Sequence, residues 1–203
     1  MKYILQIFAL ICFFAAPAFA MTGVEVGQPA PGFSLPDTHG VTQNLSDYRG
    51  KIVVLEWMNH ECPYVRKHYE SGNMQALQKE ATAQDVVWLS IVSSAPGEQG
   101  HVSAAEANEI IAQTGAVATA RLLDPEGATG RLYGAKTTPH MFIVDQGGVL
   151  VYAGAIDDSP SSNPKTIHNA TNYVQVALAD LAAGKPVAQA VTRPYGCSVK
   201  YAR

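Results

Sequence analysis

The chain has 203 residues, of which 47% are hydrophobic and 15% are charged, with a formal net charge of -3. This length suits one well-packed domain and is short of two ordinary ones, and the hydrophobic content excludes a generally disordered chain. The sequence contains no run of Lys and Arg, so we expect neither nucleic acid nor a membrane surface as a partner.

The first twenty residues have the layout of a secretory signal peptide. Lys2 provides a positive start, residues 4–14 are almost continuously apolar, and Ala18, Phe19 and Ala20 form an A-x-A cleavage site. The apolar run is too short for a comfortable transmembrane helix. We therefore expect residues 1–20 to be removed after Ala20 and the mature chain to be periplasmic or secreted.

Apolar periodicity and turn residues predict the order of elements along the mature chain. They predict, in order, a hairpin arm within 22–40, a strand at 52–57, a helix from 63 to about 81, a strand at 86–92, a helix from 103 to about 114, a strand at 121–124, a helix at 126–133, strands at 141–144 and 149–152, and a helix at 166–183.

This alternation predicts an α/β fold whose mixed central sheet is flanked by helices, with an N-terminal hairpin extension. We assign residues 21–186 to this domain. Residues 187–203 lack clear periodicity and form a C-terminal tail that carries Cys197. The polar loop over residues 157–165 predicts that Asp157 is solvated.

Cys62 comes directly after a predicted buried strand and directly before a helix that begins with Pro63. Free backbone N–H groups and the positive end of the helix dipole at such a junction favour a thiolate, which is the nucleophilic form of cysteine. His60 and Arg66 would assist as a base and as a cation, whereas Glu61 would oppose them if it points inward. The polar residues around Cys62 predict that it is exposed.

The loss of Cys12 with the signal peptide leaves Cys62 and Cys197 as the two cysteines of the mature chain. Disulfides persist in exported proteins, so a structural bridge and a redox pair are both open at this point.

Residues 57–67 resemble the active-site strand and turn of thioredoxin-like proteins, and most closely those of the peroxiredoxin-like branch of the alkyl hydroperoxide reductase and thiol-specific antioxidant family. Cys62 stands at the first cysteine of the C-x-x-C motif of that superfamily, and Val65 stands at the second. Thr138 and Pro139 resemble the loop with a cis proline that faces the reactive cysteine. The resemblance implies a thioredoxin-like fold, a cis bond before Pro139 and a groove there that docks substrate.

The chain departs from both known patterns of this superfamily. Val65 cannot resolve a mixed disulfide, and Leu55 and Asn59 replace the proline and threonine of the peroxiredoxin signature, although Asn59 can still donate a hydrogen bond to a peroxide. Residues 195–200 resemble a C-terminal motif of the peroxiredoxin-like branch, which implies that Cys197 resolves Cys62. The alternatives are that Cys197 ties down the tail or pairs between subunits.

Three classes of function therefore follow from the sequence. The first is a thiol oxidoreductase that acts on protein disulfides or hydroperoxides and takes electrons from a thiol reductant, with no cofactor. The second is a binding module that holds a peptide in the same groove or delivers a metal through Cys62 with His60 or His140. The spacing of the cysteines and histidines lacks a metal-binding motif, so we expect no metal. The third is an exported structural domain with a permanent disulfide.

Overall fold

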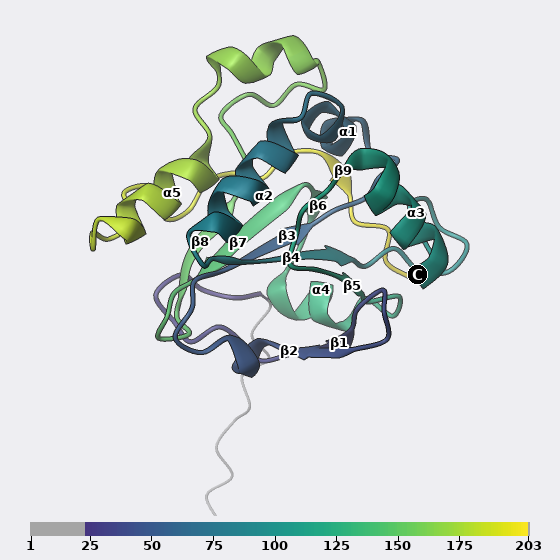
Figure 1. The fold of residues 1–203 in the computed structure, drawn as a ribbon, viewed down its shortest axis with the longest axis horizontal. Helices are drawn as coiled ribbons and strands as arrows, with labels where there is room; N and C mark the ends of the chain where they lie inside the picture. The colour runs from purple at the N-terminus through teal and green to yellow at the C-terminus, as the bar shows by residue number, and fades with distance from the viewer. Residues whose placement is uncertain (1–22, 203) are drawn as a thin grey trace, which may run out of the picture.

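The computed structural model describes residues 23–202, so the predicted signal peptide over residues 1–20 lies outside the described residues. Figure 1 shows a central sheet with helices packed on both sides. Its elements are β1 (Ser34–Pro36), β2 (Thr42–Asn44), η1 (Leu45–Tyr48), β3 (Val53–Trp57), α1 (Pro63–Glu70), α2 (Asn73–Ala83), β4 (Val87–Val92), α3 (Ala104–Thr114), β5 (Ala120–Leu123), α4 (Ala128–Tyr133), β6 (Thr137–Thr138), β7 (His140–Val144), β8 (Leu150–Gly154), η2 (Pro164–Asn169), α5 (Tyr173–Ala182) and β9 (Cys197–Ser198).

The central sheet has five strands in the order β5-β4-β3-β7-β8. Strands β3, β4 and β5 run parallel, β7 pairs antiparallel with β3, and β8 pairs antiparallel with β7, so the sheet is mixed. Every residue of β3 is buried, as expected for a strand covered on both faces. The predicted fold class, a thioredoxin-like α/β fold with a mixed central sheet, is confirmed.

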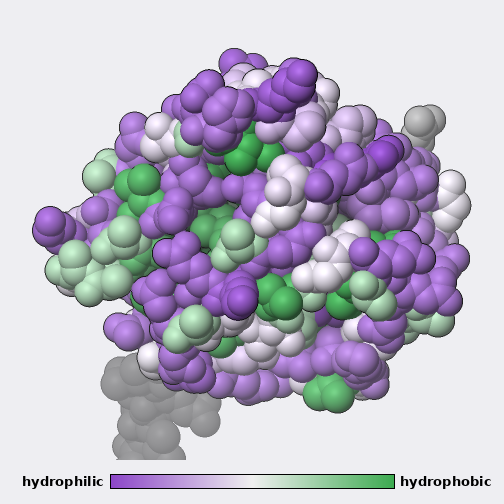
Figure 2. Space-filling view, turned by 45° about the horizontal axis from the view of Figure 1, so that its top comes forward, coloured by the Kyte–Doolittle hydropathy of each residue, from purple (hydrophilic) through white to green (hydrophobic). Residues whose placement is uncertain are grey.

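Two hydrophobic clusters lie on opposite faces of the sheet. One contains buried residues of α1, α2, α3 and α5, and the other contains residues of α4, η1 and the β1–β2 hairpin. Figure 1 shows the same division, with α4 and the hairpin below the sheet and the other helices above it. Figure 2 shows that the face it views is mostly hydrophilic, with hydrophobic residues in separate small groups.

The helix predicted from residue 63 to 81 is two helices. Gly72, at φ 77°, separates α1 from α2 in the left-handed conformation that favours glycine. The helix predicted at 166–183 begins instead at Tyr173, where the side chain of Asn172 accepts a hydrogen bond from the backbone of Gln175. Apolar periodicity does not reveal such breaks, because both sides of each break keep a helical pattern.

The C-terminal tail is ordered by pairing with the domain. Strand β9 pairs antiparallel with β6, with Cys197 opposite Thr138. Gly196 lies at φ 134°, and a Cβ atom there would lie 2.1 Å from the carbonyl oxygen of Thr138. Only glycine therefore allows the tail to approach this closely.

Over residues 23–202, no helix is long and apolar enough to cross a membrane.

Candidate active site

Cys62 lies between the end of β3 and the start of α1. It is the N-cap residue of α1, and the backbone N–H groups of Val65 and Arg66 both donate to its carbonyl oxygen at 2.9 Å. Its sulfur lies 3.1 Å from the carbonyl oxygen of Thr138. The side chain is 0% exposed, so the expectation that Cys62 is exposed was wrong. The cis-proline loop, far along the chain, lies against its sulfur.

The Thr138–Pro139 peptide bond is cis, as the resemblance implied. Thr138 is buried and contacts both cysteines, because its carbonyl oxygen accepts from the sulfur of Cys62 and its backbone pairs with Cys197. The cis-proline loop therefore brings together two cysteines that are far apart in the sequence. Both are free thiols in the structure.

The environment makes the two thiols unequal. Burial raises the pKa of Cys62, but hydrogen bonds from the side chain and backbone of Cys197 and from the backbone of Val65 outweigh burial and place the pKa below the ordinary 9.0. Burial, followed by the neighbouring Cys62, raises the pKa of Cys197 to about 12. The arrangement therefore favours a thiolate at Cys62 and keeps the proton on Cys197.

His60 and Arg66 lie beside Cys62 in sequence, but within residues 23–202 no side-chain hydrogen bond or ion pair joins either of them to its sulfur. The guanidinium of Arg66 forms an ion pair with Glu70 at 2.6 Å on an exposed face of α1. Burial lowers the pKa of His60, which favours the neutral ring. His60 and Arg66 both line a cavity whose lining does not include Cys62. Their expected role as a base and a cation at Cys62 therefore has no contact that supports it.

Asn59 is buried in the loop before Cys62, and its side-chain amide is already bonded. Its oxygen accepts from the backbone N–H of Glu61 at 2.9 Å, and its nitrogen donates to the carbonyl of Gln99 at 3.2 Å. The carboxylate of Glu61 accepts from the backbone N–H of Gly100 at 2.6 Å and does not oppose the Cys62 thiolate. Asn59 thus shapes the loop, with one of its two amide N–H donors committed to Gln99.

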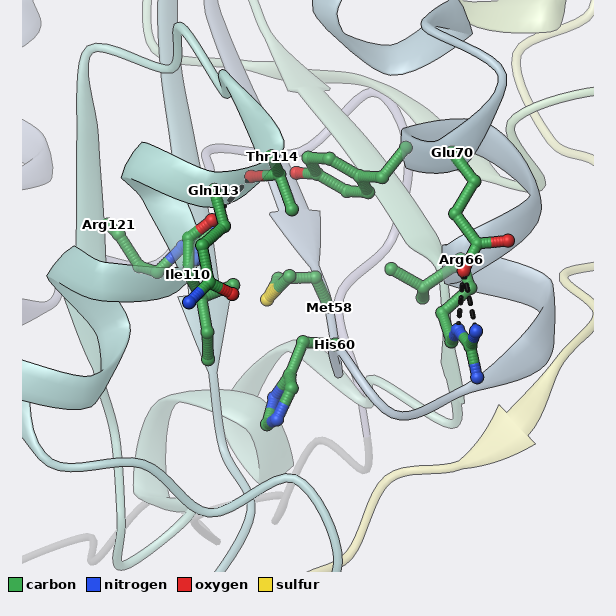
Figure 3. Close-up of a pocket in the computed structure, with 10 residues that line it drawn as sticks. Met58, His60, Arg66, Glu70, Ile110, Gln113, Thr114 and Arg121 are labelled. Atoms are coloured by element: carbon green, nitrogen blue, oxygen red, sulfur yellow. Dashed lines mark hydrogen bonds and ion pairs between the residues drawn. The ribbon is translucent and has the colours of Figure 1, made fainter.

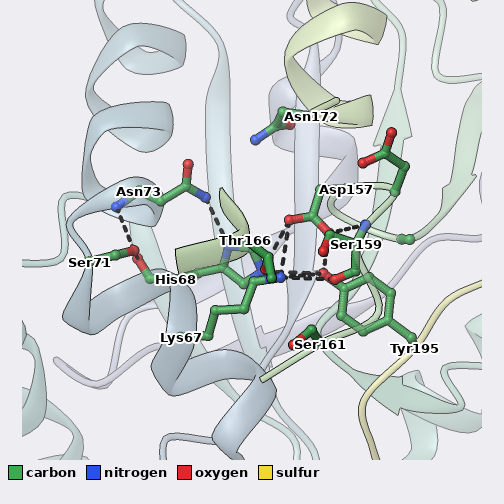
Figure 4. Close-up of polar contacts among 12 residues, drawn as sticks. Lys67, His68, Ser71, Asn73, Asp157, Ser159, Ser161, Thr166, Asn172 and Tyr195 are labelled. Carbon is green, nitrogen blue, oxygen red and sulfur yellow. Dashed lines mark hydrogen bonds and ion pairs between the residues drawn. The ribbon is translucent and has the colours of Figure 1, made fainter. Parts of the chain in front are cut away.

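A buried polar cluster connects α1 to the tail (Figure 4). We call it the tail anchor, and it consists of Lys67, His68, Asp157 and Tyr195. Lys67 Nζ lies 3.3 Å from Asp157 Oδ2, with side chains 0% and 3% exposed, and the hydroxyl of Tyr195 donates to Asp157 Oδ1. The expectation that Asp157 is solvated was therefore wrong, because Lys67 and Tyr195 cover it.

The remaining contacts of the tail anchor fix the tail near Cys62. Lys67 Nζ also donates to the carbonyl of Ser159 at 2.9 Å, and the rings of Tyr195 and Tyr64 pack edge to face at 5.9 Å. Burial lowers the pKa of His68 to about 4, so its ring is neutral near pH 7. Tyr195 precedes Cys197 by two residues. No local sequence motif marks this cluster, because its members come from segments far apart in the chain.

In the part of the chain that the structure describes, no group of three or more His, Cys, Asp or Glu side chains could hold a metal ion. His140, weighed above as a metal ligand, is buried, and its Nδ1 accepts from the backbone N–H of Lys136 at 3.3 Å. Burial lowers the pKa of His140 to about 3.

Comparisons with known proteins agree with this geometry. Thioredoxin-like protein YneN of Bacillus subtilis (strain 168) is 30% identical over 128 residues, which are 63% of this chain and 70% of that protein. An uncharacterized conserved protein from Geobacillus kaustophilus has a similar structure, with a TM-score of 0.75, 24% identity and coverage of 93% of this chain and 98% of that one. A putative thiol:disulfide interchange protein DsbE from Chlorobium tepidum has a TM-score of 0.53 and 27% identity, with coverage of 64% and 85%.

Residues 26–153 match the family model described as the AhpC/TSA family. This match spans more than half of the chain and includes Cys62 and the cis-proline loop. The structure over the same residues is the thioredoxin-like fold of that superfamily. The chain therefore belongs to the AhpC/TSA family of thioredoxin-like proteins.

Proposed function

We propose that the protein is an exported thiol-disulfide oxidoreductase in which Cys62 is the nucleophile and Cys197 is the resolving cysteine. Membership of the AhpC/TSA family indicates thiol-based oxidoreductase chemistry. The observation that carries the finer proposal is the position of Cys197, which pairs with Thr138 while the Thr138 carbonyl lies 3.1 Å from the sulfur of Cys62. Thr138 and Pro139 shape the docking groove. The substrates would be protein disulfides, and a thiol reductant would supply electrons.

The first step is attack by the Cys62 thiolate on one sulfur of a substrate disulfide. The substrate S–S bond breaks, a mixed disulfide forms at Cys62, and the released substrate thiolate takes up a proton. In the second step Cys197 loses its proton and attacks the sulfur of Cys62. The second substrate thiol leaves, and the protein holds a Cys62–Cys197 disulfide. The substrate gains two electrons and the cysteine pair loses two.

The unequal pKa values of the two thiols support this order. The Cys62 thiolate helps to hold the pKa of Cys197 at about 12. Once Cys62 is part of a mixed disulfide, it carries no negative charge, and this contribution disappears. Cys197 therefore becomes easier to deprotonate when its attack is required.

A substrate can reach Cys62 only when the tail moves aside. Cys62 is fully buried, and β9 occupies the edge of β6 where an extended substrate chain would pair. Strand β9 has only two residues, so its pairing alone is weak. The tail anchor would keep Tyr195 in place, and the backbone bonds of Val199 to Lys136 and of Lys200 to Ala95 would hold the far end of the tail, so that residues 196–198 open and close over the thiol.

A peroxide substrate receives less support. Asn59, which the sequence offered as a donor to peroxide, is buried, and its amide is bonded into the loop through Glu61 and Gln99 and not to Cys62. We therefore place disulfide exchange ahead of peroxide reduction, and the two are distinguished by mixing the reduced protein with hydrogen peroxide and with a peptide disulfide in parallel.

The test uses Cys197→Ser and Cys62→Ser with a peptide disulfide as substrate. Cys197→Ser should accumulate a mixed disulfide between Cys62 and the peptide, which intact-mass measurement detects, and Cys62→Ser should form none. Release of two equivalents of peptide thiol for each Cys62 by the Cys197→Ser protein, where the resolving role predicts one, would remove that role. A permanent structural bridge would instead give a large loss of stability on reduction and no reaction with the peptide.

A further inference from the structure

A cavity of about 420 Å³ lies beside the redox site, between α1, α3 and β5. Its volume is in the range of small-molecule sites. Figure 3 shows Arg121 extending toward Met58 on one side of the cavity, with Arg66 and Glu70 paired on the other. Met58, Val65 and Ile110 supply apolar wall. Cys62 and Cys197 do not line it, so thiol exchange makes no use of this space.

Arg121 is an unusual residue for the wall of a cavity. It lies on β5 and is 4% exposed, and its Nε and Nη2 atoms have no hydrogen-bond partner within residues 23–202. None of the four ion pairs within residues 23–202 includes Arg121. A buried guanidinium cannot lose its charge under ordinary conditions, so an unpaired one is costly.

Glu56 is the buried carboxylate on the same face of the sheet, and it is already satisfied. The strand registers place Glu56 beside Ser90 and Ser90 beside Arg121, so a strand separates the two charged residues. Four other groups donate to the Glu56 carboxylate. They are Tyr69 Oη at 2.9 Å, Gln78 Nε2 at 3.2 Å, Trp88 Nε1 at 2.8 Å and Ser90 Oγ at 2.9 Å. The free donors of Arg121 therefore require an acceptor from elsewhere.

We propose that this cavity binds a small organic carboxylate, whose carboxylate group pairs with Arg121 and whose apolar body packs on Met58, Val65 and Ile110. A guanidinium has two parallel N–H donors that match a carboxylate. The cavity offers one unpaired positive charge, because Arg66 is paired with Glu70, so a monoanion fits better than a phosphate of higher charge. The ligand would lie against α1, which positions Cys62.

The test compares hexanoate with hexanamide, which has the same apolar body without the charge. Thermal shift and isothermal titration calorimetry on the wild-type protein should show binding of hexanoate and markedly weaker binding of hexanamide. Arg121→Met should weaken hexanoate binding at least about tenfold, since it removes a charge-assisted hydrogen bond. Arg193→Met, which removes an exposed arginine of the tail, should bind hexanoate as the wild type does.

A location readout keeps the test decisive if Arg121→Met does not fold. In wild-type protein with labelled methionine methyl groups, hexanoate should shift the resonance of Met58 saturably and leave that of Met141, buried in the core, in place. Cys62→Ser should bind hexanoate like the wild type, so a failure of the redox proposal does not affect this one. Equal binding of hexanoate and hexanamide, full binding by Arg121→Met, or an unmoved Met58 would each overturn the proposal.

Discussion

The substitution Gly196→Ala tests whether the tail controls access to Cys62. A Cβ at residue 196 would lie 2.1 Å from the Thr138 carbonyl oxygen and would have to adopt φ 134°, so alanine cannot keep β9 in place. Loss of the short β6–β9 pairing removes backbone hydrogen bonds worth about 0.5–1.5 kcal/mol each, or about 2 kcal/mol together. A loss of about 2 kcal/mol raises the fraction of molecules whose tail has moved away from Cys62 roughly 30-fold.

The assay is the rate of alkylation of Cys62 by iodoacetamide in the folded protein, in a Cys197→Ser background and after removal of residues 1–20. In that background Cys62 is the one remaining thiol. Gly184→Ala is the matched control, because Gly184 also has a positive φ of 68° but a Cβ there would meet no atom within 4 Å. We expect Gly196→Ala to react roughly 30-fold faster and Gly184→Ala to match its parent. Equal rates for all three proteins would refute the tail as the cover of Cys62.

Three further predictions follow from the same contacts. Asp157→Asn leaves the buried Lys67 charge unpaired and should lower the free energy of unfolding, measured by urea denaturation, by about 3–5 kcal/mol. The double variant Asp157→Leu/Lys67→Met should recover much of the lost stability. An unchanged denaturation midpoint in Asp157→Asn would contradict the buried ion pair. The dependence of the Cys62 alkylation rate on pH should give a pKa below 9.0 in the wild type and a higher pKa in Cys197→Ala, since that variant removes a hydrogen bond to the thiolate. The same pKa in both proteins would show that Cys197 does not stabilise the Cys62 thiolate. Expression of the full chain in a bacterial host should give an exported protein cleaved after Ala20, which N-terminal sequencing checks, and an uncleaved chain would remove the export proposal.

Much of the fold could be predicted because its signals are local. Strands β3 and β4 are mostly apolar and contain Glu56 and Ser90 as their polar residues, and Ser103 and Glu106 form a capping box at the start of α3. The break at Gly72 and the late start of α5 escaped prediction, because a helical apolar pattern continues across both. Strand β9 escaped it for another reason: its pairing depends on a glycine that lets the tail approach Thr138.

Some features of the site could likewise be predicted from the sequence, and others could not. The position of Cys62 at a strand-to-helix junction followed from its neighbours in sequence, the cis bond before Pro139 was implied by a family resemblance, and the structure has both. The burial of Cys62 and of Asp157 could not be read from neighbours in the sequence, since residues far along the chain cover them. Arg121 is a further case, because a single arginine in a predicted strand gives no sign of the cavity beside it.

The most direct test of the central claim is non-reducing peptide mapping of the reduced protein after reaction with one equivalent of a peptide disulfide. We expect a linked peptide that contains Cys62 and Cys197, together with two equivalents of released peptide thiol for each disulfide consumed. Peptide disulfide consumed without a Cys62–Cys197 link, or a link that joins two separate chains, would contradict it.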